Sequence, residues 1–92
     1  MRFEWDEGKA VENVEKHDGV SFEEASTVFG DLLATSVIDP DHSDEEERWL
    51  TTGLSDRGRV VIVWHTNRGD AVRIIGARPA TPAERRVYES GE

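Results

Sequence analysis

The segment Val60–Trp64 is a run of five large apolar residues, and it constrains the fold more than any other part of the sequence. A strand that is apolar on both sides belongs in the middle of a sheet, where both faces are covered. The segments before and after it in the sequence are predicted to be strands that pair with it. A strand is predicted over 48–54, and another over 71–78 follows Asn67–Asp70, whose glycine suits a tight hairpin turn. Strands joined by such short turns are predicted to pair antiparallel.

The first part of the chain predicts a strand and two helices. A short apolar–polar–apolar alternation at 3–5 suits a strand, and the segment 8–16 has the apolar spacing of a helix. The predicted apolar face of that helix consists of Ala10, Val11 and Val14. Ser21 and Glu24 have the spacing of a capping box, which predicts a second helix that ends near residue 30.

The remaining segments complete the predicted order. A strand is expected over 33–38, and 39–47 holds six acids and no large apolar residue, which indicates a solvated loop. Thr81 and Pro82 are the cap and first residue of a last helix. The predicted fold is α+β in the order strand, helix, helix, four strands, helix. Its antiparallel sheet packs against the two N-terminal helices and the C-terminal helix.

Length and composition limit the classes of protein. A chain of 92 residues predicts a single domain, 1–92. The absence of cysteine excludes disulfide scaffolds, thiolate metal sites and cysteine nucleophiles. No stretch has the ~18 apolar residues of a membrane span, and the acidic start is unlike a signal peptide. We therefore expect a cytoplasmic protein with no membrane partner.

The charge is divided unevenly along the chain. Residues 1–56 carry sixteen acids and four bases, a net of −12, whereas 57–92 carry four acids and seven bases, a net of +3. All seven of these bases are arginine, whose planar guanidinium binds phosphate through two hydrogen bonds at once. Two interpretations remain open: arginine chosen for solubility, or a side of the protein that faces phosphate.

No metal site or other cofactor is predicted. The three histidines, His17, His42 and His65, have no second histidine at ligand spacing. The segment 39–44 superficially suggests a calcium loop, but it lacks the central glycine and the spacing of one. A charged loop is the better interpretation of this segment.

Cleavage of RNA without a metal is one reaction in which the arginines could take part, although any arginine-rich sheet offers a similar set of side chains. Such cleavage needs a base near the 2′-hydroxyl, a proton donor for the leaving oxygen and fixed positive charge on the phosphate. Arg73 and Arg78 flank one predicted strand, on opposite faces if the side chains alternate regularly, and Arg48 begins another. Each of these arginines also has a structural interpretation, since arginines often pair with a neighbouring acid. Trp64, at the end of the central strand, is another candidate for the site, but tryptophan is more often found in a core.

Short stretches along nearly the whole chain resemble one known family. In the first part they are Phe3-Glu4-Trp5-Asp6, Lys9, Asn13, Lys16-His17 and Val20-Ser21-Phe22-Glu23-Glu24-Ala25. In the second part they are Glu47-Arg48, Gly53, Arg57-Gly58-Arg59, His65-Thr66-Asn67-Arg68-Gly69-Asp70, Arg73-Ile74-Ile75, Ala77-Arg78 and Glu84-Arg85-Arg86-Val87-Tyr88. In their order and spacing these stretches resemble the BrnT toxin family. Two differences are a first loop that is one residue longer, at Asp18-Gly19, and Gly76 where a serine usually stands.

The resemblance implies a RelE-like fold and an endoribonuclease toxin that inhibits translation by cutting RNA. It also implies a partner, a BrnA-type antitoxin with a ribbon-helix-helix part. That antitoxin would cover the toxin in a hetero-oligomer and would supply the only contact with DNA. The acidic half of the chain fits such a basic partner.

The reaction and the resemblance together predict the site residues. Arg48, Arg73 and Arg78 are predicted to hold and neutralise the phosphate. His17 or Glu47 is predicted to accept the proton, and His65 or Tyr88 to donate one or to stack. Further RNA contacts are predicted for Lys9, Arg68, Trp64 and Tyr88.

Two other classes of protein remain as alternatives. A non-catalytic interaction domain of the same fold would bind a basic partner protein without cutting RNA. A DNA-binding regulator is the weaker alternative, because the two best-patterned helices are acidic and neither suits DNA recognition.

Overall fold

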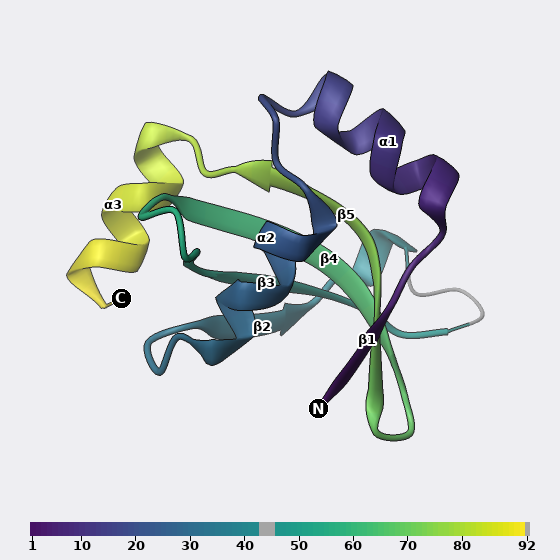
Figure 1. The fold of residues 1–92 in the computed structure, drawn as a ribbon. Helices are drawn as coiled ribbons and strands as arrows, with labels where there is room; N and C mark the ends of the chain where they lie inside the picture. The colour runs from purple at the N-terminus through teal and green to yellow at the C-terminus, as the bar shows by residue number, and fades with distance from the viewer. Residues whose placement is uncertain (43–45, 92) are drawn as a thin grey trace.

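The computed structural model describes residues 1–42 and 46–91 and has a five-stranded sheet in the order β1-β5-β4-β3-β2 (Figure 1). The strands are β1 (Arg2–Glu4), β2 (Thr35–Ile38), β3 (Arg48–Leu54), β4 (Val60–Arg68) and β5 (Ala71–Pro79). The helices are α1 (Glu7–Lys16), α2 (Phe22–Thr27) and α3 (Pro82–Ser90), with short 3₁₀ segments η1 (Val28–Gly30) and η2 (Pro40–His42). The predicted mixture of helices and strands is confirmed.

The sheet is mixed, so the expectation of an entirely antiparallel sheet is wrong for β1. The pairs β2–β3, β3–β4 and β4–β5 are antiparallel, and the short turns after β3 and β4 account for the last two of these pairs. In contrast, β1 pairs parallel with β5, with Phe3 opposite Val72. A tight turn forces an antiparallel pair, but most of the chain lies between β1 and β5, and this long connection permits a parallel pair.

One face of the sheet carries the hydrophobic core, with α2 and its flanking residues packed over it. The sheet contributes Val61 and Val63 from β4 and Val72, Ile74 and Ala77 from β5. The cover contributes Val20, Phe22, Ala25 and Val28. The prediction for β4 is confirmed, because Val60–Val63 are all at most 7% exposed and lie between β3 and β5.

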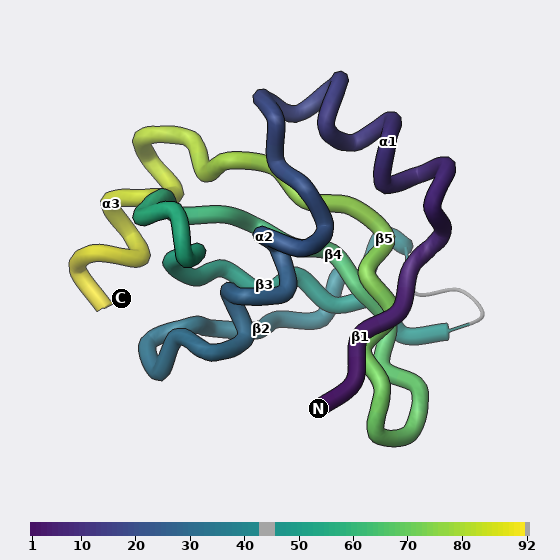
Figure 2. The backbone as a smooth tube through the Cα atoms, viewed as in Figure 1, coloured from purple at the N-terminus to yellow at the C-terminus, as the bar shows by residue number. Residues whose placement is uncertain are grey.

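Helix α1 packs through only part of the predicted apolar face, because Ala10 alone of its three residues contacts the core. Val11 and Val14 are exposed, and the buried residue of the helix is Asn13. Its amide donates to the carbonyls of Val20 at 2.8 Å and Ala77 at 2.9 Å, and the Ala77 N–H donates back to Asn13 Oδ1 at 3.1 Å. Strand β1 pairs only with residues 71–73, so Asn13 serves the backbone of β5 beyond that point, where α1 runs beside the strand (Figure 2).

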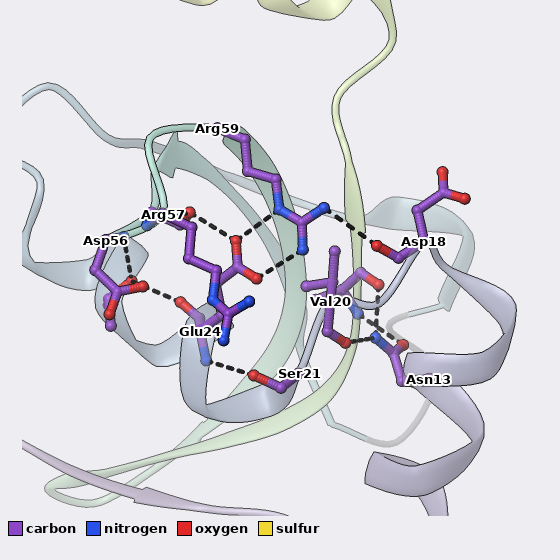
Figure 3. Close-up of polar contacts among 11 residues, drawn as sticks. Asn13, Asp18, Val20, Ser21, Glu24, Asp56, Arg57 and Arg59 are labelled. Carbon is purple, nitrogen blue, oxygen red and sulfur yellow. Dashed lines mark hydrogen bonds and ion pairs between the residues drawn. The ribbon is translucent and has the colours of Figure 1, made fainter.

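A buried ion pair fixes α2 to the turn between β3 and β4 (Figure 3). The Glu24 side chain is 1% exposed and accepts from Arg59 Nε at 2.8 Å, Arg59 Nη2 at 2.7 Å and Ser55 Oγ at 2.7 Å. Arg59 Nη1 also donates to the carbonyl of Asp18 at 3.1 Å. The hydrogen bond from Arg59 lowers the pKa of Glu24, so the carboxylate is charged and fully paired at neutral pH.

The segment between α2 and β3 differs from the prediction at two points. Strand β2 begins at Thr35 rather than Leu33, because the Asp31 carboxylate accepts from the N–H groups of Leu33 and Leu54 and turns the chain there. Within the predicted acidic loop 39–47, residues 40–42 form η2, and residues 43–45 lie outside the described part of the chain. Among the described residues, no helix has the length and apolar character needed to cross a membrane.

Candidate functional site

A β-bulge in β5 brings Arg73 and Arg78 to the same face of the sheet. Arg73 lies opposite Thr66 of β4 and Arg78 lies opposite Ile62, and the register shifts between these pairs at Trp64/His65. Ile62 and Thr66 are four residues apart on one strand and therefore face the same side. The expectation that the two arginines lie on opposite faces is wrong because the bulge adds one residue and reverses the alternation.

A pocket of about 280 Å³, here called the cationic pocket, lies on this face, away from the core. It is lined by Lys9, His42, Glu46, Arg48, Thr66, Arg68, Arg73 and Ile75. Four of these residues are cations from four elements, α1, β3, β4 and β5, whereas one is a carboxylate. The structure thus brings together four of the predicted site residues, Lys9, Arg48, Arg68 and Arg73.

Arg68 of β4 and Arg73 of β5 differ in how closely each is paired with a carboxylate. Both Arg68 Nε and Nη2 donate to the Glu46 carboxylate at 3.1 Å, and this lowers the pKa of Glu46. Arg73 Nη1 lies 3.9 Å from Glu4 Oε1, beyond hydrogen-bond distance. The Arg73 guanidinium, one third exposed, therefore keeps hydrogen-bonding capacity for an anion in the pocket.

Besides Arg73, Thr66 is a second residue whose side chain suits the cationic pocket to an anionic ligand. The residue is 5% exposed, and its Oγ1 is a buried atom for which the described residues offer no hydrogen-bond partner. Buried hydroxyls are nearly always hydrogen-bonded in folded proteins. A buried donor in a pocket lined by cations is suited to an oxygen of a bound anion.

Arg78 lies in a different hollow and not in the cationic pocket. It lines an apolar groove of about 660 Å³ between the same sheet face and α3, which stands at the end of the sheet away from the β4–β5 turn (Figure 1). Its Nη1 and Nη2 donate to the two oxygens of Glu84 at 2.7 and 2.9 Å. Five residues along β5 separate Arg78 from Arg73, about 15 Å at the rise of a strand. The predicted meeting of Arg48, Arg73 and Arg78 is therefore not observed.

The Arg78–Glu84 pair predicts a specific acid dependence of stability. The hydrogen bonds from Arg78 lower the pKa of Glu84 from 4.5 to about 2. A lowered pKa in the folded state adds stability above pH 4.5 that is lost as the pH falls toward 2. We expect Glu84→Gln to have a smaller fall in unfolding free energy across this range than the wild type, with the two values converging at the acid end. Urea denaturation at a series of pH values measures this, and parallel curves would contradict it.

Two other predicted site residues lie outside the cationic pocket. His65 is 3% exposed on the core face, where Nε2 contacts Thr51 Oγ1 at 2.7 Å, Nδ1 contacts Asn67 Oδ1 at 3.1 Å and the ring packs on Phe29. Burial lowers the pKa of His65, which favours a neutral structural histidine. Tyr88 donates its hydroxyl to Asp31 and thereby ties α3 to the chain before β2.

Trp64 lies on the pocket face, at the position along β4 between Ile62 of the apolar groove and Thr66 of the cationic pocket. Its indole lies across Gly76 of β5, so close that a Cβ on residue 76 would stand 2.2 Å from Cε2 of the indole. The ring of His17, just after α1, meets the indole edge-on with centroids 5.8 Å apart. Gly76 therefore permits the position of Trp64, and His17 contacts Trp64 without lining either hollow.

We expect Gly76→Ala to displace the Trp64 indole. The added methyl overlaps the ring, and overpacking of this kind costs about 1–3 kcal/mol. The contact between the rings of Trp64 and His17 should be lost, which proton NMR detects as missing cross-peaks. Gly30→Ala is the matched control, because a Cβ at residue 30 meets nothing within 4 Å. Unchanged cross-peaks in Gly76→Ala would contradict this account.

The cationic pocket contains three polar residues that the sequence did not single out for it. Glu46 lines it in place of the predicted Glu47, which is exposed, and His42 lines it in place of His17 and His65. Thr66 is the third. The sequence held one indication of two of these residues: positions 42 and 46 come just before β3, which begins with the predicted site residue Arg48. Among the described residues, no three His, Asp or Glu side chains gather as a metal-binding group.

The fold and the cationic pocket define a class: a small α+β protein with a cation-lined pocket on the sheet face opposite its core. The chain belongs to the family described as ribonuclease toxin, BrnT, of type II toxin–antitoxin systems, whose sequence profile matches residues 5–84. The crystal structure of the Brucella abortus ribonuclease toxin BrnT is similar in fold, with a TM-score of 0.64 and 24% identity. The match covers 88% of this chain and 97% of that one. A search of curated proteins gave no significant match.

Proposed function

We propose that this chain is a metal-independent endoribonuclease toxin, RelE-like in its fold, that inhibits translation by cutting RNA at the cationic pocket. The observation that carries the proposal is the buried, unpartnered Thr66 hydroxyl beside cations from four elements. A phosphodiester carries a single negative charge that grows as the 2′-oxygen attacks. Fixed cations and a buried hydroxyl stabilise that growing charge without a metal ion.

The proposed roles follow the placement of the residues. Arg48 and Arg73 hold the scissile phosphate, and Thr66 donates to one of its oxygens. Lys9 and Arg68 stand in the same pocket and contact the adjoining phosphates. Arg78 instead fixes the start of α3 through Glu84, so we assign it a structural role in place of the predicted catalytic one.

Trp64 and His17 are proposed to support an RNA base next to the cleaved bond. The indole lies on the pocket face, one alternate position along β4 from Thr66, and it is partly exposed. Aromatic rings stack on bases regardless of sequence, with about 1–3 kcal/mol per base. Because His17 supports the indole in this proposal, the proton acceptor is sought among the residues that line the cationic pocket.

The family implies an antitoxin as partner. We propose that it is a BrnA-type ribbon-helix-helix protein, that it covers the cationic pocket and that DNA is bound through it alone. The net charge of −9 makes the chain itself a poor DNA binder and favours a basic partner. We place the complex in the cytoplasm, where translated RNA is found.

Expression of the chain alone should arrest growth, and co-expression of the antitoxin should restore it. The purified chain should cleave RNA in the presence of EDTA, with free RNA and RNA on translating ribosomes as separate substrates. Cleavage products ending in a 2′,3′-cyclic phosphate would identify attack by the 2′-hydroxyl. Intact RNA in both assays, together with tight binding of the antitoxin, would instead support the non-catalytic interaction domain.

A further inference from the structure

We propose that His42, oriented by Asp39, is the general base of the cationic pocket, an inference that rests on the proposed endoribonuclease function. The two residues belong to the segment 39–47, which the sequence predicts to be a solvated acidic loop. In the structure, His42 at the end of η2 instead lines the pocket.

The contact between Asp39 and His42 has the geometry of an oriented base. Asp39 Oδ2 lies 2.9 Å from Nδ1 of His42, while Oδ1 accepts from the Asp41 N–H at 3.2 Å. The Asp39 side chain is 14% exposed, whereas that of His42 is 60% exposed. With Nδ1–H donating to the carboxylate, Nε2 is the ring nitrogen left to accept a proton.

The pair is also fixed to the strand that supplies the phosphate ligand. The N–H of Asp39 donates to the carbonyl of Arg48 at 2.7 Å. Arg48 is the first residue of β3 and lines the pocket with His42. The base and the proposed phosphate-binding arginine are therefore held in register by a backbone hydrogen bond.

The other candidates for the base are occupied elsewhere. His65 uses both ring nitrogens inside the core, and the His17 ring packs against Trp64. Glu46 lies in the pocket, but two hydrogen bonds from Arg68 hold its carboxylate, and its lowered pKa makes it a weaker base. Among the described residues that line the pocket, His42 is the one imidazole, and the contact with Asp39 uses Nδ1 and not Nε2.

The proposed reaction is an attack of the 2′-oxygen of the RNA on the adjacent phosphate. Nε2 of His42 takes the proton of the 2′-hydroxyl, and the 2′-oxygen forms a bond to the adjacent phosphorus. The bond from phosphorus to the 5′-oxygen breaks with its electron pair, and water supplies the proton for that oxygen. The products are a 2′,3′-cyclic phosphate and a free 5′-hydroxyl, with no change of oxidation state.

The test uses the full-length chain without antitoxin and an RNA that the wild type cleaves. We expect His42→Gln to lower the cleavage rate by roughly 10²–10⁴-fold, the usual contribution of a positioned base. Affinity for the same RNA with a 2′-deoxy group at the cleavage site should stay within about 3-fold, because that analogue lacks the proton to be removed. Asp41→Asn, one residue beyond Pro40 in the same turn, is the control and should cleave like the wild type.

The pH dependence separates orientation from a structural role for Asp39. Among the described residues, the titratable and charged groups beside His42 are Asp39, which contacts it, and Lys9, Glu46, Arg48, Arg68 and Arg73, which line the same pocket. The wild-type cleavage rate should fall at acid pH, as general-base catalysis requires, and Asp39→Asn should move this limb to a different pH. His42→Gln should lose the limb.

Each result decides a separate claim. If the wild type cleaves RNA and His42→Gln cleaves it equally well, the assignment of the base is overturned while the proposed function stands. If the wild type leaves free and ribosome-bound RNA intact, both are overturned. An Asp39→Asn variant with a lower rate but an unmoved pH profile would reduce Asp39 to a structural residue and overturn its part in the proposal.

Discussion

Arg73→Ala should lower the rate of RNA cleavage by roughly 10²–10³-fold, the range seen when a donor to a developing negative charge is removed. Arg73 lines the cationic pocket, and within the described part of the chain its ion-pair partner is Glu4, with 3.9 Å between Arg73 Nη1 and Glu4 Oε1. The substitution therefore removes positive charge from the proposed phosphate position without freeing a tightly bonded carboxylate. Initial rates on a defined RNA measure the effect, and the melting temperature should change little.

Two arginines serve as controls for Arg73. Arg85→Ala removes an exposed arginine from α3 that lines neither hollow, and it should cleave RNA like the wild type. Arg78→Ala should lower stability through the loss of its two bonds to Glu84 while cleavage changes by less than about 3-fold. Equal cleavage by Arg73→Ala and Arg85→Ala would remove the cationic pocket from the mechanism.

Asn13→Leu should lower the free energy of unfolding by about 3 kcal/mol or more. The Leu side chain has similar volume but leaves three backbone groups without their partner: the N–H and carbonyl of Ala77 and the carbonyl of Val20. Each buried polar group left unpaired costs about 1–3 kcal/mol. The melting temperature should fall by roughly 12–24 °C, since 1 kcal/mol corresponds to about 4–8 °C in a domain of this size.

Glu15→Leu is the matched control for Asn13, because it introduces the same side chain on an exposed position of α1. It should stay within about 0.5 kcal/mol of the wild type, as surface substitutions usually do. Thermal and urea unfolding measure both variants. Equal stability of Asn13→Leu and Glu15→Leu would show that α1 contributes little to holding β5.

The predictable part of the fold is the part set by local rules. The apolar run at 60–64 and the glycine of 67–70 place β4 and its hairpin. The side chains of Ser21 and Thr81 cap their helices as the sequence predicts, but Glu24 pairs with Arg59 and does not complete the capping box with Ser21. The direction of β1 was not predictable in this way, because it depends on a partner about 70 residues distant. The role of Asn13 was missed for the same reason, since a polar residue is buried in a helix only when a distant backbone needs it.

The site was predicted in composition more successfully than in geometry. Lys9, Arg48, Arg68 and Arg73 share a pocket, as their charge suggests, but a single bulged residue at Ile75 decides which face Arg78 occupies. The spacing of residues in the sequence does not predict such a bulge. The Thr66 hydroxyl became notable only through the lack of a partner, which is a property of the folded chain.

The position of Asn13 also affects how copies of the chain can associate. Unpaired strand edges are templates for aggregation, because their free backbone groups can bind another sheet. Here β1 and the Asn13 amide together occupy much of the outer edge of β5, which leaves β2 as the opposite rim. That rim is four residues long, Thr35–Ile38, and offers few backbone groups to a second copy. Neither edge of the sheet is therefore well suited to fibre-like self-assembly of the chain.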